Sequence, residues 1–500
     1  MRTTIRKIYL SAARATSVST FCNIYTRFII IIAEITYLNS ILWGVMIISK
    51  SDYMLYLKHP AWLWVKKHDP SKIPPIDAAT QAMFDTGYAF EPYVESLFEG
   101  AVRLGFDNYD EYRSLPVRTQ HALEQGAKAL IQPRFEWRNF TCISDIVQVV
   151  DGKTVDLYEI KSSTSVKPEH ILDLAFQVAV LDGCGYEVRE VYVAHVNNRY
   201  VRQGDVDPRQ LSTIVNVTER VMEEYETTLD TMQQALAVAV QTQMPDPDPS
   251  FAGLGARKDW LRIYENIFPS PPTVWPEDTE PVIDHDEIKQ FLDGLKYPLY
   301  FLDYETMQGL VPYFDGQRPY QQIPFQYSLH ILRQPGGELE HHEYLHAENS
   351  DPGRAVAERL VQDLGSSGTI IVWNQSFEKT RNVEMGQMYS EHAEAMQAIN
   401  ERVVDLMVPF KAKWYDDPRF EGSASIKNVL PVVCPELSYK DLGIQDGNTA
   451  QRFWMAAVLD GTRDTEKQQI LDDLIEYCKL DTLAMVEIYK KLGDIVRREN

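Results

Sequence analysis

The chain has few cysteines for its length, and they are far apart. Its 500 residues contain five cysteines, none of which forms a Cys-x-x-Cys pair. A zinc site, an iron–sulfur cluster and a disulfide framework each need clustered cysteines, so this distribution argues against all three. It is typical of a protein from a reducing compartment, and we expect a cytoplasmic location. The cysteines are Cys22, Cys142, Cys184, Cys434 and Cys478.

The chain also lacks an excess of positive charge. Its formal net charge is −23, whereas a protein that only binds nucleic acid usually has a basic surface. An enzyme that uses divalent ions can be acidic overall, because the ions offset the negative charge locally. The composition therefore argues against tight non-specific binding of nucleic acid, but it is compatible with metal-dependent catalysis.

The length predicts more than one domain, since a domain has on the order of 150 residues. No internal repeat or low-complexity tract is present. Residues 244–290 are rich in Pro and Asp and are expected to form a linker, with a helix at Trp260–Phe268 inside it. This linker separates a domain at 46–243 from a domain at 291–500.

The first 45 residues differ from the rest of the chain. Residues 1–27 are basic, and residues 28–48 are mostly apolar, which is close to the roughly 20 residues that a membrane-spanning helix needs. Glu34 and Asn39 interrupt the apolar run, and a coherent domain begins at Ile47. We expect the natural protein to begin at Met46 and to have no stable membrane association; a translated membrane anchor is the alternative.

The hydrophobic pattern predicts a mixed α/β (α+β) chain. Asp151-Gly152-Lys153 lies between two β-rich runs and indicates a hairpin. The expected helices are 53–64, capped near Ser49, 87–100, 170–183, 208–240 and 465–498. The expected strands are 140–150, 154–161, 188–198, 297–306, 324–332 and 369–375.

The hairpin contains the first set of acidic residues. Main-chain pairing of its two strands is expected to bring Asp145 beside Glu159. Residues i and i+2 of a strand share a face, so Glu159 and Lys161 are expected to point the same way while Ile160 points into the core. Two carboxylates can hold Mg²⁺, and Lys161 can orient a water molecule or stabilise a phosphate.

This set resembles the RecB-like branch of the PD-(D/E)XK nucleases, a restriction-endonuclease-like fold. The resemblance implies a Gln on the next helix, which fits Gln177, and an upstream acidic ligand, for which Glu91 is the candidate and Glu95 the second choice. Some relatives hold an iron–sulfur cluster, but the matching run KHPAWLW has no cysteine, so no cluster is expected. An ordinary hairpin with exposed charges is the alternative.

A second set of acidic residues lies in the other domain. Asp303 and Glu305 alternate on an expected strand, Glu378 follows the run TIIVWNQSF, and Tyr477 and Asp481 are four apart in an expected helix. Four carboxylates that converge would repel one another unless cations neutralise them. Two Mg²⁺ or Mn²⁺ ions would do so and would promote phosphodiester hydrolysis.

The second set resembles the DEDD 3′–5′ exonucleases, which have an RNase H-like fold. Asp303-Tyr304-Glu305 matches the first motif, and Tyr477-x-x-x-Asp481 matches the Tyr-type third motif. The second motif carries Asn374, a candidate contact to nucleic acid, but has Glu378 where the family has Asp. The segment 297–489, with LDYET, WNQSFEKTR and GSASIKNVLP, resembles an uncharacterised bacterial family often fused to RecB-like domains.

Three further sets of polar residues can be considered as parts of a site. Lys427, near the start of an expected helix, is a candidate phosphate contact, although a plain capped helix is equally consistent. Asp405 is expected to be structural. His341 and His342 are expected in a solvated loop.

Both sets together predict a nuclease with Mg²⁺ or Mn²⁺ as its cofactor. The expected substrate is DNA rather than RNA, in DNA repair or defence, because the resemblance to RecB-like domains implies it. The alternative is a nucleic-acid-binding or scaffolding protein in which one or both sites are degenerate.

Overall fold

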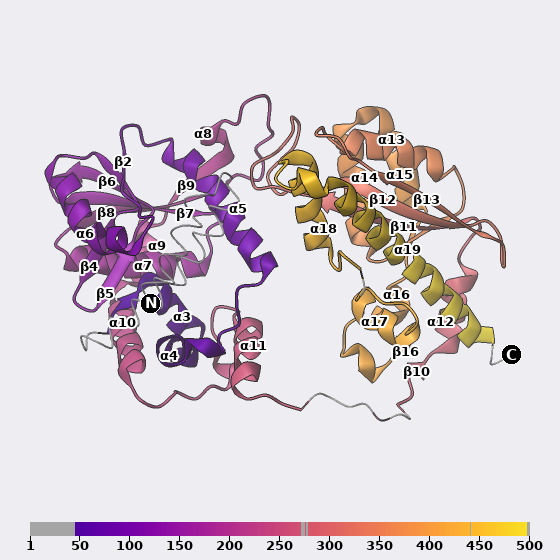
Figure 1. Cartoon of the computed structure of the whole chain (residues 1–500), viewed down its shortest axis with the longest axis horizontal. Helices are drawn as coiled ribbons and strands as arrows, with labels where there is room; N and C mark the ends of the chain where they lie inside the picture. Colours follow the sequence, from indigo (N-terminus) through magenta and orange to yellow (C-terminus); the bar gives the residue numbers. More distant parts are fainter. Residues whose placement is uncertain (1–45, 272–275, 277–278, 441, 498–500) are drawn as a thin grey trace. The chain divides into compact units, whose positions relative to one another are not determined.

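The computed structural model describes residues 46–271, 276, 279–440 and 442–497. The chain divides into two compact units, Met1–Pro271 and Pro272–Asn500 (Figure 1). Both units contain helices and sheets, so the expectation of a mixed α/β chain is confirmed. Within the described residues, no helix is both long and apolar enough to cross a membrane. The expected start at Met46 and the alternative membrane anchor concern residues 1–45, which lie outside the described residues.

The N-terminal unit is built on a six-stranded sheet with the order β2-β3-β6-β7-β8-β9. The hairpin β6–β7 is antiparallel and turns at Gly152, whose φ of 51° suits glycine. β7 and β8 are parallel and are connected by helix α7. The main strands are β2 (Val102–Arg103), β3 (Ala129–Ile131), β6 (Ile146–Asp151), β7 (Thr154–Lys161), β8 (Glu187–Val196) and β9 (Ser212–Asn216). A smaller sheet has the order β1-β5-β4 and consists of β1 (Ile48–Ser49), β5 (Phe140–Ile143) and β4 (Arg134–Trp137).

Helices cover these strands and close a hydrophobic core around α7. Buried side chains of α7 such as Leu174 and Phe176 share one cluster with Leu157 of β7 and with Met232 of α10. The helices are α3 (Lys50–Lys58), α4 (Pro60–His68), α5 (Ala78–Glu95), α6 (Tyr109–Glu124), α7 (Pro168–Gly183), α8 (Pro208–Leu211), α9 (Thr218–Glu223), α10 (Tyr225–Val240) and α11 (Arg257–Ile267).

The expected elements of this unit differ from the observed ones in four places. The strand expected over 140–150 is two strands, β5 and β6, which belong to different sheets. The helix expected over 53–64 is two helices, because His59 is extended and Pro60 begins α4. Strand β9 lies inside the range 208–240, which was expected to be helical. The helix expected over 87–100 begins earlier, at Ala78, and ends at Glu95.

The range expected as a linker is partly folded. Helix α11 packs against α4, with Trp260 and Ile263 buried beside Ala61 and Val65. The ring of His59 stacks on Trp260 with centroids 4.4 Å apart. Apolar contacts therefore attach residues up to the end of α11 to the N-terminal unit.

The C-terminal unit contains a five-stranded sheet with the order β13-β12-β11-β14-β15. β11 is antiparallel to β12 and parallel to β14. The strands are β11 (Leu299–Met307), β12 (Ile323–Leu332), β13 (Leu339–Leu345), β14 (Thr369–Val372) and β15 (Val403–Asp405). His341 and His342 lie on β13, so the prediction that they lie in a loop is wrong. β13 pairs with β12 over its whole length, and the main-chain hydrogen bonds of this pairing hold it in the sheet.

Helices lie on both faces of this sheet (Figure 1). Alternate residues of β11 point to opposite faces, so Tyr300, Leu302 and Tyr304 pack in the core with α13, α14 and α15. Phe301 packs on the other face, in a core shared with α12, α17 and α19. The helices are α12 (His285–Asp293), α13 (Gly353–Asp363), α14 (Gln375–Met388), α15 (Ala393–Glu401), α16 (Val408–Lys411), α17 (Ile426–Val433), α18 (Gly447–Trp454) and α19 (Lys467–Arg497).

Two short strands, β10 (Val282–Ile283) and β16 (Tyr415–Asp416), pair in the C-terminal unit.

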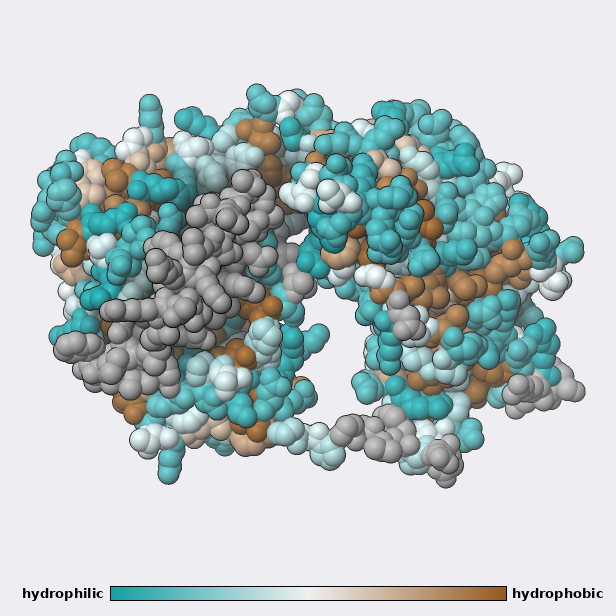
Figure 2. Space-filling model, in the orientation of Figure 1, coloured by the Kyte–Doolittle hydropathy of each residue, from teal (hydrophilic) through white to brown (hydrophobic). Residues whose placement is uncertain are grey.

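Hydrophilic residues predominate on the face of the molecule in Figure 2, with hydrophobic residues between them. Most of the chain's large hydrophobic side chains are nevertheless buried in its cores.

Candidate functional sites in the two units

Three carboxylates converge in the C-terminal unit. Asp303 and Glu305 lie on β11 and Asp481 lies on α19, and one oxygen of each lies within 4.8 Å of the others. This is the one group of three or more potential metal ligands in the described part of the chain. Strand alternation places both β11 carboxylates on the face that α19 covers. The sequence motifs Asp303-x-Glu305 and Asp481 thus supply one shared cluster.

Burial and mutual repulsion make this cluster costly when no cation is bound. Burial raises the pKa of Asp303 well above its usual value, and the charge of Asp481 adds to the increase. Burial, followed by the charges of Asp303 and Asp481, raises the pKa of Glu305 in the same way. Carboxylate oxygens are the ligands that Mg²⁺ and Mn²⁺ prefer. The donor set and its unbalanced negative charge therefore fit a divalent ion held by these three residues.

Two tyrosines hold Asp481. The hydroxyl of Tyr439 donates a hydrogen bond of 2.7 Å to Asp481 Oδ1, and Tyr477 also interacts with this carboxylate. Burial raises the pKa of Asp481 to about 6, and the hydrogen bond from Tyr439 limits the increase. Tyr477 is 4% exposed. Its position on α19, one turn before Asp481, puts its hydroxyl at the cluster.

Glu378 lies outside the group of three. It is on the first turn of α14, is 1% exposed, and its Oε2 has no hydrogen-bond partner within the described structure. Burial raises the pKa of Glu378 well above its usual value, and the charge of Asp303 raises it further. Glu378 is therefore close enough to feel Asp303 but is not among the converging oxygens. An unpartnered buried carboxyl oxygen is costly, and a bound cation would offset that cost.

The three acids lie at the wall of a pocket with a volume of about 430 Å³. Its polar and charged wall includes Lys427 and Asn448, and its apolar wall includes Trp373 and Phe377. Lys427 Nζ donates a hydrogen bond to the main-chain oxygen of Gln445 at 2.9 Å, and its charge acts on both Glu305 and Asp481. The complete lining is Asp303, Tyr304, Glu305, Thr306, Gln308, Gln322, Trp373, Phe377, Ile426, Lys427, Asp446, Gly447, Asn448, Gln451, Tyr477, Asp481 and Met485.

Asn374 does not line this pocket. It is exposed, and its side-chain oxygen accepts a hydrogen bond from Ser376 Oγ at 2.6 Å. Its backbone φ is 81°. Asp405 accepts hydrogen bonds from the main-chain N–H groups of Asn374, Gln375 and Met407. Asp405 thus holds the turn before α14, a structural role.

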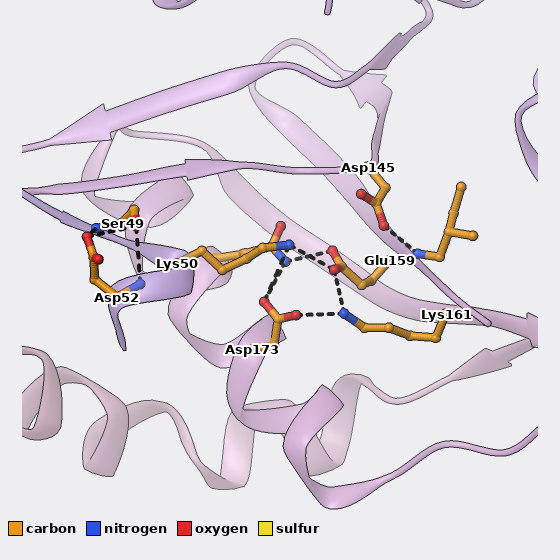
Figure 3. Close-up of polar contacts among 9 residues, drawn as sticks. Ser49, Lys50, Asp52, Asp145, Glu159, Lys161 and Asp173 are labelled. Carbon is orange, nitrogen blue, oxygen red and sulfur yellow. Dashed lines mark hydrogen bonds and ion pairs between the residues drawn. The ribbon is translucent and has the colours of Figure 1, made fainter. Parts of the chain in front are cut away.

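The acidic residues of the N-terminal unit have a different environment (Figure 3). Glu159 Oε1 accepts hydrogen bonds from Lys50 and Lys161, each at 2.8 Å. Its Oε2 accepts a hydrogen bond of 2.7 Å from Gln177. Although burial alone would raise it, Lys161 and Lys50 hold the pKa of Glu159 far below its usual value. Asp173 on α7 completes the network, with Oδ2 at 2.8 Å from Lys161.

This network corrects the expected orientation of the strand. Glu159 is 2% exposed, whereas Ile160 is only half-buried, so the prediction that Ile160 points into the core is wrong. Glu159 and Lys161 face α7, where Asp173 and Gln177 supply partners. A buried charge is tolerated when it is paired and hydrogen-bonded, which is why the charged residues occupy the covered face.

Asp145 and Glu91 lie beside this network. Asp145 Oδ2 accepts a hydrogen bond of 2.6 Å from the main-chain N–H of Ile160. Burial raises the pKa of Asp145 to about 8, and the charge of Glu159 contributes. Burial, together with the nearby charge of Glu95, raises the pKa of Glu91 to about 7. Glu95 itself forms an ion pair with Arg103 at 2.5 Å.

As arranged here, Glu159 offers no free carboxylate oxygen to a metal ion. Both oxygens of Glu159 already have partners, and two lysines balance the charges of Glu159 and Asp173. The structure therefore brings Asp145, Glu159, Lys161 and Gln177 together. Lys50 contacts the Glu159 carboxylate that was expected to bind a metal ion.

Sequence reasoning missed three residues of these sites. Asp173 is four residues before Gln177 on α7, so helical spacing was a signal that pointed to it. Lys50 lies 109 positions from Glu159, and Tyr439 lies 42 positions from Asp481. No local pattern connects those pairs.

One family model matches part of the C-terminal unit, and three curated proteins match part of the chain. Residues 300–425 match a family model described as Domain of unknown function (DUF2779). A Mycoplasma genitalium protein described as Uncharacterized protein MG366 is 26% identical over 235 residues, and its Mycoplasma pneumoniae homolog is 27% identical over 236. Ureaplasma parvum has a relative described as Uncharacterized protein UU173, which is 26% identical over 234 residues.

The chain spans only part of these relatives. The first two alignments each cover 43% of this chain and 35% of the relative, and the third covers 41% and 33%. These matches support the expected relationship to an uncharacterised family. The descriptions of the matching proteins name no activity.

Proposed function

We propose that the chain is a divalent-metal-dependent nuclease whose working site is the acidic cluster of the C-terminal unit. The observation that carries the proposal is the convergence of Asp303, Glu305 and Asp481 within 4.8 Å at the wall of a pocket. The three motifs that resemble the DEDD exonucleases contribute residues to or beside this place. This supports an RNase H-like fold for the C-terminal unit and 3′–5′ exonuclease activity.

Bound Mg²⁺ or Mn²⁺ would supply an activated water molecule and stabilise the negative charge of the leaving 3′ oxygen. The chain's own residues would do the rest. Asp303, Glu305 and Asp481 would hold the ion, and a second ion would also use Glu378. Tyr477 would position the water molecule. Its high pKa, which burial raises, makes it an orienting group rather than a base.

The pocket supplies groups suited to a nucleotide. Lys427 offers a positive charge to a phosphate on the same wall as the acidic cluster. Trp373 and Phe377 offer aromatic surface, on which nucleic-acid bases commonly stack. A volume of about 430 Å³ lies within the usual range of about 300–1,000 Å³ for ligand pockets. DNA is the proposed substrate in preference to RNA, in repair or defence, on the resemblance to RecB-like domains alone.

The N-terminal unit is proposed to have the PD-(D/E)XK fold. The antiparallel hairpin that joins Asp145 to Glu159 and Lys161, followed by α7 with Gln177, supports this assignment. A degenerate N-terminal site is the second candidate, in which this unit binds nucleic acid without cutting it. The observation that favours it is the neutralisation of Glu159 and Asp173 by two lysines.

A cleavage assay distinguishes these functions. Labelled single-stranded DNA and RNA are incubated with wild type, Lys161→Ala and Asp303→Ala in Mg²⁺ or Mn²⁺. We expect Asp303→Ala to lose cleavage and Lys161→Ala to retain it. Intact substrate with wild type would contradict nuclease activity, and binding that persists in a chelator without any cleavage would select the binding or scaffolding function.

A further inference from the structure

Lys50 reaches the N-terminal site from a helix whose start is tightly fixed. Ser49 caps α3: its hydroxyl accepts from the N–H of Asp52, and Asp52 accepts from the N–H of Ser49. Asp52 in turn forms ion pairs with Lys66 at 2.9 Å and with Lys67 at 2.7 Å. A capping box of this kind defines the helix start. Lys50, the first residue of α3, therefore projects from a well-defined backbone position.

The ammonium group of Lys50 lies between two carboxylates (Figure 3). Its Nζ is 2.8 Å from Glu159 Oε1 and 3.6 Å from Asp173 Oδ1. The side chain of Lys50 is 21% exposed, whereas those of Glu159 and Asp173 are 2% and 7% exposed. These ion pairs are thus largely shielded from water. Electrostatic interactions are stronger in such a shielded position than at an exposed surface.

Lys161 alone could neutralise only one of the two carboxylates. It contacts Glu159 Oε1 and Asp173 Oδ2, both at 2.8 Å. With Lys50 present, two positive charges balance two negative ones, and Gln177 occupies the other oxygen of Glu159. A divalent ion that used Glu159 would have to approach Lys50 and would meet its positive charge.

We propose that Lys50 is the resident cation of the N-terminal site and competes with divalent ions for Glu159. The N-terminal unit then binds Mg²⁺ or Mn²⁺ weakly, while the C-terminal cluster, whose three carboxylates form no direct ion pair with a lysine among the described residues, binds it more tightly. This inference rests on the PD-(D/E)XK fold proposed for the N-terminal unit and on the metal binding expected from the sequence for Asp145 and Glu159. It gives Lys50 a positioning and regulatory role rather than a catalytic one.

The test measures Mn²⁺ binding to the full chain by the electron paramagnetic resonance signal of free Mn²⁺. The parent protein carries Asp303→Asn and Asp481→Asn, which remove the C-terminal cluster. Lys50→Met is added to this parent and is expected to tighten Mn²⁺ binding at least tenfold. Lys50→Arg keeps the charge and is expected to bind as weakly as the parent.

A matched lysine on the same helix controls for the loss of one positive charge. Lys58 is the last residue of α3, and its Nζ lies 5.5 Å from the ring centroid of Trp62. Lys58→Met is expected to leave Mn²⁺ binding unchanged. Adding Asp145→Asn to Lys50→Met is expected to remove the gained affinity, and circular dichroism establishes that each variant is folded.

The outcomes separate this inference from the proposed function. Equal, tight Mn²⁺ binding by the parent and by Lys50→Met, lost on Asp145→Asn, would overturn the role of Lys50 and leave the N-terminal metal site standing. No binding in either protein would overturn both the role of Lys50 and the N-terminal metal site. The C-terminal nuclease is tested separately, by Mn²⁺ binding and cleavage with the unsubstituted chain.

Discussion

Tyr439 donates a hydrogen bond of 2.7 Å to Asp481 Oδ1 across 42 positions of sequence. The hydroxyl stabilises the ionised carboxylate of Asp481 and keeps its pKa from rising above about 6. The ring of Tyr439 also lies near Tyr477, with centroids 6.0 Å apart. One tyrosine outside the recognised motifs thus holds Asp481 and lies beside Tyr477, the two groups that α19 contributes to the cluster.

Tyr439→Phe removes this hydrogen bond while keeping the ring. A hydrogen bond to a charged group contributes about 1.5–3 kcal/mol, so we expect Mn²⁺ affinity to fall roughly tenfold or more, with a parallel loss of cleavage. Isothermal titration measures the affinity. Tyr297→Phe, which breaks the 2.8 Å contact between the Tyr297 and Tyr489 hydroxyls, is the control, and unchanged affinity in Tyr439→Phe would show that the hydrogen bond is unimportant.

Glu378→Gln replaces a buried carboxyl group whose Oε2 has no hydrogen-bond partner in the described structure. Because burial raises its pKa, the Glu378 carboxyl destabilises the metal-free fold at pH 8, and we expect the amide to increase the free energy of unfolding by about 1–2 kcal/mol. The gain should shrink near pH 4, where the carboxyl is protonated in both states. Urea unfolding measures it, with exposed Glu394→Gln on α15 as control. A less stable Glu378→Gln at pH 8 would contradict the prediction.

The pH dependence of stability follows from the acidic cluster. The pKa values of Asp303 and Glu305 are raised, and that of Asp481 is about 6. Groups with raised pKa values stabilise the fold fully only below their unfolded pKa, near 4, and that contribution is lost as the pH rises through the folded pKa. The metal-free protein should therefore lose stability as the pH rises above about 4, through the pKa of about 6 of Asp481.

Divalent ions should reverse this loss, because they bind the ionised cluster of the folded protein. Thermal unfolding with a chelator or with Mn²⁺, at pH 5 and pH 8, measures the effect, which should be larger at pH 8. The effect should be smaller in Asp303→Asn. Asp52 has the opposite sign: Lys66 and Lys67 lower its pKa despite its burial, so its contribution is lost only below about pH 4. An Mn²⁺ effect of equal size at both pH values would argue against the cluster as the binding site.

Glu159→Gln should act in the opposite direction to Glu378→Gln. Glu159 is buried and accepts from Lys50, Lys161 and Gln177, so its removal leaves two lysines with one carboxylate fewer. Loss of one partner from a buried ion pair costs about 3–5 kcal/mol; because both lysines are partly exposed, we expect a loss of roughly 1–3 kcal/mol. Urea unfolding is compared with that of Glu219→Gln, an exposed position on α9. Unchanged stability would show that the network is not a stabilising one.

Local patterns predicted the strands that carry the acidic motifs. The alternation in the hairpin and the apolar run before Asp303 place β7 and β11 where the structure has them. Spacing of four residues in a helix placed Tyr477 beside Asp481. These features depend on residues that are close in sequence, and the two-residue period of a strand and the 3.6-residue period of a helix are enough to predict them.

Features that depend on distant partners were not predictable in this way. Glu159 lies on the buried face because Lys50 and α7 compensate its charge, and no pattern near residue 159 contains Lys50. His341 lies on a strand because β12 pairs with it. The polar sequence around it favours a loop, but main-chain pairing overrides that local preference.

The most direct measurement is the release of label from single-stranded DNA that carries it on the 3′-terminal nucleotide. Wild type in Mg²⁺ or Mn²⁺ should release labelled mononucleotide before the body of the strand shortens, and Asp303→Asn should release none, although it remains folded. An intact 3′ end with wild type, or equal release by Asp303→Asn, would contradict a nuclease site at Asp303, Glu305 and Asp481.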